Sequence, residues 1–127
     1  MQEHIDTLTK LLRQAKTEGT DAADAVLFST TDVSQSQRLG KLEGLERAES
    51  KAVGLRAFIG GRQAIASSTD LSASALAELA ARAVAMAKAA PEDPDSTLAP
   101  LALHPASLPD LELEDRKEPP LSWLSEQ

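Results

Sequence analysis

Apolar positions near the start of the chain recur at intervals of three and four residues, which places them on one face of an α-helix. These positions are Ile5, Leu8, Leu11, Leu12 and Ala15. Gly19 follows the pattern, where a left-handed helix cap favours a residue without a Cβ. The spacing therefore predicts an amphipathic helix over residues 3–18.

Short apolar or alternating segments come next, separated by residues typical of turns. Residues 23–30 are apolar, include Val26 and Phe28, and predict a buried strand that ends at the polar cluster Thr30-Thr31-Asp32. Alternation of side-chain character predicts four further strands, with reversals at Gly40-Lys41 and at Gly60-Gly61. These strands cover residues 33–39, 42–50, 53–59 and 62–67.

A second helix is indicated after Asp70. Ser72 is a candidate N-cap, because its hydroxyl can accept a hydrogen bond from a free backbone N–H in the first turn. An apolar stripe follows at helical spacing, and Pro91 ends it. The stripe consists of Leu76, Leu79, Ala80, Ala83, Val84 and Ala87.

The order of elements predicts an α+β fold. Connections of one to three residues force neighbouring strands to be antiparallel, and two amphipathic helices need one apolar sheet face to cover. We expect a two-layer sandwich in which about five antiparallel strands are flanked by two helices. A sheet that curls further is an open alternative.

Composition divides the chain near Ala90. All six Gly lie in the first 90 residues, whereas all seven Pro lie beyond them, together with nine acidic and two basic residues that carry the whole net charge of −7. We expect a folded domain over residues 1–95 and an acidic, Pro-rich, extended linker over residues 96–127. Pro119-Pro120 resembles a helix start, which predicts that the chain is a piece of a longer protein.

The same composition narrows the classes of function. The chain has no Cys, which excludes disulfides, Cys-based zinc sites and a cysteine nucleophile and favours a cytoplasmic location. With a negative net charge and only three aromatic residues, it is poorly supplied for nucleic-acid binding. No apolar run is long enough for a membrane span, and the first residues do not read as a signal peptide.

The sequence offers few candidate metal-binding or catalytic residues. His4 and His104 lie far apart without helical His-Glu-x-x-His spacing, so both are read as surface histidines, and no Gly-x-Ser-x-Gly elbow is present. Four arginines on the predicted strands are candidates for a peptide or subunit contact on the open face of the sheet. They are Arg38, Arg47, Arg56 and Arg62. The alternative is that they form cross-strand ion pairs with Glu43, Glu46 and Glu49.

Four segments in order resemble the N-terminal region of the TldD/PmbA family, and within it the PmbA (TldE) branch, also called modulator of DNA gyrase. They are Arg38-Leu-Gly-Lys-Leu-Glu43, Gly54-Leu-Arg-Ala-Phe-Ile-Gly-Gly-Arg-Gln63, Ser67-Ser-Thr-Asp-Leu-Ser72 and Pro91-Glu-Asp-Pro94. The similarity runs from about Ile5 to Leu98, and residues 111–115 resemble the family's link into its next segment.

The resemblance implies the N-terminal, noncatalytic domain of a subunit in a cytoplasmic zinc metallopeptidase assembly, involved in proteolysis and peptide maturation. It implies a TldD-type partner subunit and peptide or unfolded polypeptide substrates, with no nucleic acid or membrane partner. The family's His-Glu-x-x-x-His zinc helix has no counterpart in these 127 residues. We therefore expect zinc only in the catalytic subunit, and no catalytic, metal or cofactor residue is carried over.

Two other interpretations stay open. A stand-alone interaction module could modulate a basic partner such as DNA gyrase through the acidic tail. The polar strand at residues 33–39 suits a sheet edge, which either accepts an extended peptide as an added strand or is covered by the missing part of the chain or by a partner subunit.

Overall fold

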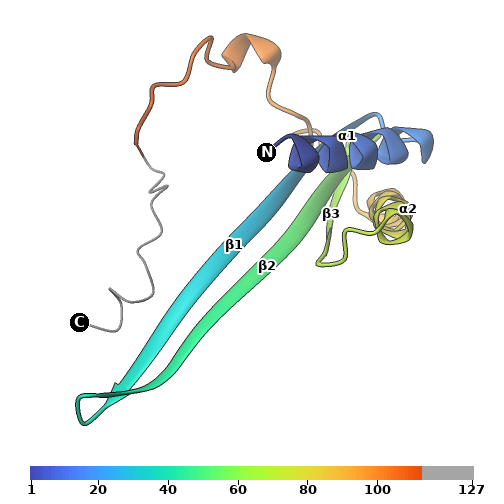
Figure 1. The fold of residues 1–127 in the computed structure, drawn as a ribbon. Helices are drawn as coiled ribbons and strands as arrows, with labels where there is room; N and C mark the ends of the chain where they lie inside the picture. The colour runs from blue at the N-terminus through green and yellow to red at the C-terminus, as the bar shows by residue number, and fades with distance from the viewer. Residues whose placement is uncertain (113–127) are drawn as a thin grey trace. The chain divides into compact units, whose positions relative to one another are not determined.

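The computed structural model describes residues 1–112, and the predicted helix start at Pro119-Pro120 lies outside them. The described residues form two α-helices. α1 (Gln2–Thr17) precedes the strands in the chain, and α2 (Ala73–Ala89) follows them. The strands are β1 (Ala22–Arg38), β2 (Lys41–Ile59) and β3 (Arg62–Ser68), and a 3₁₀ turn, η1, follows at Leu101–Leu103. The expected α+β class is confirmed (Figure 1).

The sheet has three strands in the order β1-β2-β3, not the five expected. Residues 30–32 were expected to turn, but β1 runs through them because Thr30 and Thr31 are β-branched and no Gly or Pro interrupts the strand. β2 likewise joins the predicted strands 42–50 and 53–59, since residues 51 and 52 are Lys and Ala. Two pairs of expected strands are therefore two long strands.

The chain divides into two compact units. Among the described residues, the first unit comprises residues 1–30 and 50–99, and the second comprises residues 31–49 and 100–112. β1 and β2 each contribute residues to both units.

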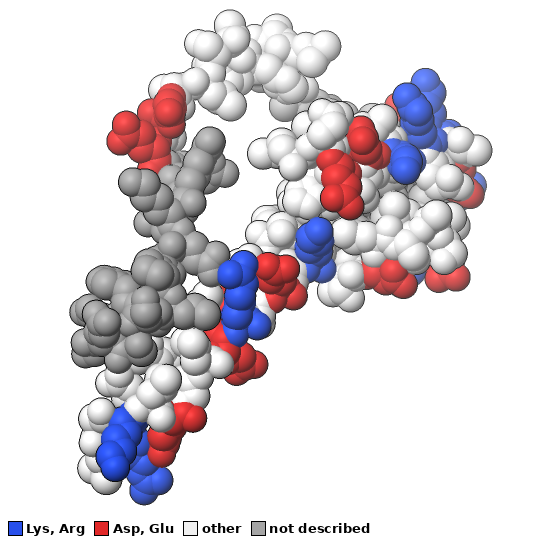
Figure 2. Space-filling model, viewed as in Figure 1, with Lys and Arg blue, Asp and Glu red and all other residues white. Residues whose placement is uncertain are grey.

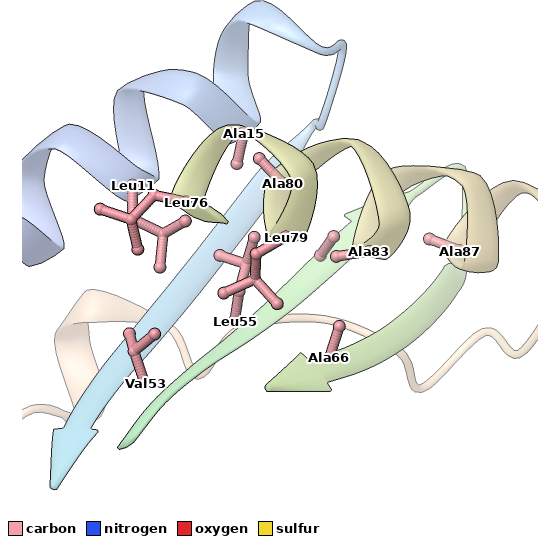
Figure 3. Close-up of a cluster of buried hydrophobic side chains, with 11 residues drawn as sticks. Leu11, Ala15, Val53, Leu55, Ala66, Leu76, Leu79, Ala80, Ala83 and Ala87 are labelled. Atoms are coloured by element: carbon pink, nitrogen blue, oxygen red, sulfur yellow. The ribbon is translucent and has the colours of Figure 1, made fainter. Parts of the chain in front are cut away.

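In the first unit, both helices pack on one face of the sheet and form two layers (Figure 3). Leu11 and Ala15 of α1 and the whole predicted stripe of α2 are buried. From β2, Val53, Leu55 and Ala57 point into this core, and Leu55 is fully buried.

The opposite face of this part of the sheet is only partly covered. β2 pairs with β3 in an antiparallel register that sets Arg56 opposite Ile65 and Leu55 opposite Ala66. Since side chains alternate between faces, Ile65 points away from the helices and is 65% exposed. Val26 and Phe28 are also exposed, so the expectation of a buried strand at residues 23–30 is wrong for these two residues.

The predicted Gly60-Gly61 turn and the predicted Ser72 cap are confirmed, whereas the reversal expected at Gly40-Lys41 lies one residue earlier, at Leu39-Gly40. Gly60 and Gly61 have φ angles of 53° and 74°, as the tight β2–β3 turn requires. Ser72 caps α2 by accepting a hydrogen bond from the Ala75 N–H at 3.3 Å. After α2, the chain returns to the β2–β3 turn, where the Asp93 N–H donates to the Gly61 carbonyl at 2.6 Å.

The second unit contains the end of the β1–β2 hairpin. Its strands are exposed at nearly every position from 31 to 49, with only Val33, Gln35 and Gly44 half-buried. β3 pairs with β2 only from Val53 to Ile59, so these hairpin residues do not pair with β3. Residues 100–112 of this unit are exposed throughout.

Candidate functional site

The four candidate arginines lie in two different units. Arg38 and Arg47 belong to the second unit, and Arg56 and Arg62 to the first. They were expected on successive strands, but Arg47 and Arg56 share β2 because that strand is continuous.

Arg56 and Asp24 form the best-defined polar pair on the outer face of the first unit. The Arg56 guanidinium binds both carboxylate oxygens of Asp24, through Nε at 3.0 Å and through Nη2. The hydrogen bond that Arg56 donates to the Asp24 carboxylate raises the pKa of Arg56 above its ordinary value. The guanidinium also lies over the Phe58 ring, 5.1 Å from its centroid, an arrangement that favours cation–π attraction.

A shallow groove of about 320 Å³ lies beside this pair. Gly54 forms part of its lining, and the Val26 side chain lies 3.5 Å from the position that a Cβ on Gly54 would occupy. Ile65 adds an exposed apolar wall. The groove has the character of a contact surface, since it combines apolar walls with one neutralised ion pair.

Arg62 has a different role, at the end of α2. Residue 62 is opposite Ile59 in the register and three positions from Ile65, so Arg62 and Arg56 point to opposite faces of the sheet. Its Nη1 donates to the carbonyl oxygen of Lys88 at 2.8 Å. A cation at the carboxyl end of a helix satisfies a free carbonyl and favours the helix dipole.

In the second unit, the arginines lie beside acidic side chains. Arg38 is 3.9 Å from Glu43, a cross-strand pair, and Arg47 is 3.2 Å from Glu49 on its own strand. All these side chains are about half or more exposed, so each pair is worth less than about 1 kcal/mol. Figure 2 shows basic and acidic side chains interleaved over the hairpin, in place of a patch of one sign.

The described part of the chain offers no set of side chains suited to zinc. Within residues 1–112, no three His, Asp or Glu side chains lie close enough together to hold a metal ion. No helix in this range is both long and apolar enough to cross a membrane.

Asp24 is the residue that sequence reasoning missed. Because Thr30-Thr31-Asp32 was read as a turn, the neighbour of β2 could not be assigned, and Asp24 had no expected partner. An acidic residue in an otherwise apolar strand was the available signal, since a half-buried carboxylate needs a cation or a donor.

Comparison with known proteins identifies the family. The family model for PmbA/TldA metallopeptidase domain 1 matches residues 23–87. The chain is 34% identical over 93 residues to Metalloprotease PmbA of Escherichia coli O157:H7, and 33% identical over 92 residues to the Metalloprotease PmbA homolog of Haemophilus influenzae. These matches cover 73% and 72% of this chain but only 21% and 20% of the relatives, so the chain spans about a fifth of their length.

Solved structures support the same fold. A modulator of DNA gyrase from Bacteroides thetaiotaomicron superposes with a TM-score of 0.75 at 20% identity, over 87% of this chain and 25% of that protein. TldE from Thermococcus kodakarensis superposes with a TM-score of 0.64 at 17% identity, over 74% of this chain and 21% of that protein. The chain belongs to the PmbA/TldD metallopeptidase family and contains that family's first domain.

Proposed function

We propose that this chain is the N-terminal, noncatalytic domain of a PmbA/TldE-type subunit in a cytoplasmic zinc metallopeptidase assembly. The observation that carries the proposal is the match of residues 23–87 to the first domain of the family. In this assembly a TldD-type partner subunit holds the zinc, and the substrates are peptides or unfolded polypeptides undergoing proteolysis and maturation.

The domain's contribution is contact and enclosure. Its described residues lack a metal-ligand cluster, whereas the hairpin and the outer sheet face leave apolar and charged side chains exposed. Such surfaces suit subunit contacts, in which an apolar centre is surrounded by charges. The candidate contact residues Arg38 and Arg47 lie on the exposed hairpin, and Arg56 borders the groove.

The test is a binding measurement between the 127-residue chain and the TldD-type subunit of the source organism. Isothermal titration calorimetry should give a saturable complex, and the chain alone, with zinc supplied, should not hydrolyse an unfolded polypeptide such as casein. Hydrolysis by the chain alone would place catalysis here, and the absence of a complex would refute the subunit role.

A second candidate function is modulation of DNA gyrase through the acidic tail. Two observations favour this function. The similar structure from Bacteroides thetaiotaomicron is a modulator of DNA gyrase, and residues 100–112, which include the acidic Asp110 and Glu112, are exposed. Binding to gyrase that weakens with salt and disappears when residues 96–127 are removed would support this function. Binding that is unchanged by the truncation would eliminate it.

A further inference from the structure

The outer face of the sheet in the first unit carries apolar side chains that the described residues leave uncovered. Ala23 and Ala25 of β1 pack against the core. The alternate residues Val26 and Phe28 therefore point to the other face. Val26, Phe28 and Ile65 are 47%, 62% and 65% exposed, and we call these three residues the outer patch. Both helices lie on the opposite side of the sheet (Figure 3), so the outer patch is the side of this unit that is open to another apolar surface.

A missing side chain shapes the surface beside the outer patch. Gly54 of β2 lies next to Val26 on one side and is paired with Ser67 of β3 on the other. Because Gly54 has no side chain, a groove of about 320 Å³ is left, with Val26 and Ile65 in its walls. The groove leaves room for an apolar side chain inserted from another surface.

The polar part of the groove does not call for a charged partner. The Arg56 guanidinium is bound to both carboxylate oxygens of Asp24, and the groove lining contains no other charged residue. Further along β2 on the same face, Phe58 lies under this guanidinium and is only 4% exposed. The face thus has a covered end at Phe58 and an uncovered end at the outer patch. An occupant that matches the uncovered end has an apolar surface without net charge.

The length of the relatives indicates which occupant this is. The chain spans about a fifth of both curated relatives and between a fifth and a quarter of the two superposed proteins. In those proteins the first domain is therefore joined to several times its own length of further polypeptide. A domain tethered in this way is present at an effective concentration on the order of millimolar. A second copy or a separate subunit has to compete with that tethered domain for the same face.

We propose that the outer patch seats another domain of the same polypeptide, which inserts an apolar side chain into the groove at Gly54 and packs against Phe28. The proposal rests on family membership and not on the subunit role proposed above. It assigns the face opposite the helices to a contact within one polypeptide, and it leaves the exposed hairpin for contacts between subunits.

Cysteine labelling tests this coverage, because the 127-residue chain has no Cys of its own. Ser67→Cys places a thiol beside Gly54 on the exposed outer face, and the control Ala81→Cys places one on the exposed side of α2. Both variants are made in this chain and in the full-length protein, purified without other subunits. Labelling with N-ethylmaleimide is followed by peptide mass spectrometry. In the full-length protein, Ser67→Cys should react on the order of tenfold or more slowly than in the chain, whereas Ala81→Cys should react at similar rates in both.

Dilution of the full-length protein identifies the occupant. Coverage by a domain of the same polypeptide does not depend on concentration, whereas coverage by a second copy is lost on dilution. Protection of Ser67→Cys that disappears on dilution, or that requires a TldD-type subunit, would overturn the proposal. Equal labelling of Ser67→Cys in the two proteins, or an open reading frame that ends at Gln127, would also overturn it. Calorimetric titration with the TldD-type subunit is a separate measurement, so the two proposals can fail independently.

Phe28→Asp tests the apolar contact itself. Phe28 is already 62% exposed in this chain, so the substitution should shift the melting temperature of the chain little. In the full-length protein the new carboxylate would lie against an apolar surface, and the melting temperature should fall by several degrees more. Ala81→Asp adds the same charge on the exposed side of α2 and should shift both proteins alike. Equal shifts for Phe28→Asp in the two proteins would show that no other domain packs against Phe28.

Discussion

Replacing Leu55 with alanine tests the position of the core in the first unit. Leu55 is fully buried on β2 among residues of both helices. The substitution removes three carbon atoms, which corresponds to about 2.4 kcal/mol of lost transfer free energy at about 0.8 kcal/mol per methylene. The cavity left behind raises the cost to about 3–4 kcal/mol, a large share of the roughly 5–10 kcal/mol that stabilises a domain of this size.

The matched control is Ile65→Ala on the neighbouring strand. Ile65 also loses three carbon atoms, but it is 65% exposed on the face away from the helices, so its cost should stay below about 1 kcal/mol. Urea unfolding followed by far-UV circular dichroism measures both variants. With an m-value of about 1 kcal/mol/M, Leu55→Ala should lower the midpoint by roughly 3 M and leave m unchanged.

Two results would contradict this reasoning. A cost below about 1 kcal/mol for Leu55→Ala, well short of the usual range for buried leucines, would mean that the helices do not cover this face of the sheet. Equal costs for the two variants would mean that the outer face is also buried, for example by self-association of the chain.

Three further predictions concern local interactions and the sheet edge. Ser72→Ala should cost about 1 kcal/mol of unfolding free energy, because it removes the α2 cap. Ser74→Ala, on the same exposed turn, is the control and should cost less. Equal losses of unfolding free energy would contradict the capping role. The Asp70 carboxylate accepts a hydrogen bond from the Ser72 N–H at 2.9 Å, which lowers the pKa of Asp70 below its ordinary value of 3.8. The contribution of the Asp70 carboxylate to stability is therefore present above pH 3.8 and is lost as the pH falls through the lower folded pKa. NMR titration of Asp70 should show this lowered midpoint. Ser72→Pro removes the N–H donor and should return the pKa of Asp70 toward 3.8. Amide exchange at residues 33–49 should slow when an unstructured peptide is added to the assembly if the edge strand β1 accepts substrate, and exchange that does not change would show that this edge does not hold peptide.

The sequence predicted the helices and the caps because those signals are local. The stripe from Leu76 to Ala87 is buried at every expected position, since helical spacing alone decides which side chains share a face. Ser72 and the Gly60-Gly61 turn were likewise readable, because each depends on the chemistry of one or two residues.

The strands were harder to predict, because their ends depend on pairing between distant residues. Thr30-Thr31-Asp32 satisfies the rules for a turn and also those for an exposed strand, and only the neighbouring strand decides between them. The partner of Arg56 was hidden for the same reason, since Asp24 lies 32 positions earlier in the chain. The reversal was expected at Gly40-Lys41, and the structure places it one residue earlier, which puts Leu39 in the turn.

The continuity of β1 and β2 limits how this hairpin can change length during evolution. Leu55 faces the core and Arg56 faces away, and a shift of one residue along either strand would exchange those environments. An insertion in only one strand between residues 31 and 49 must be absorbed as a bulge or must displace the pairing next to the core. Matched insertions, with equal numbers in both strands, keep the pairing intact. Family members with longer or shorter hairpins should therefore differ by even numbers of residues, unless a bulge or a turn of different length accompanies the change.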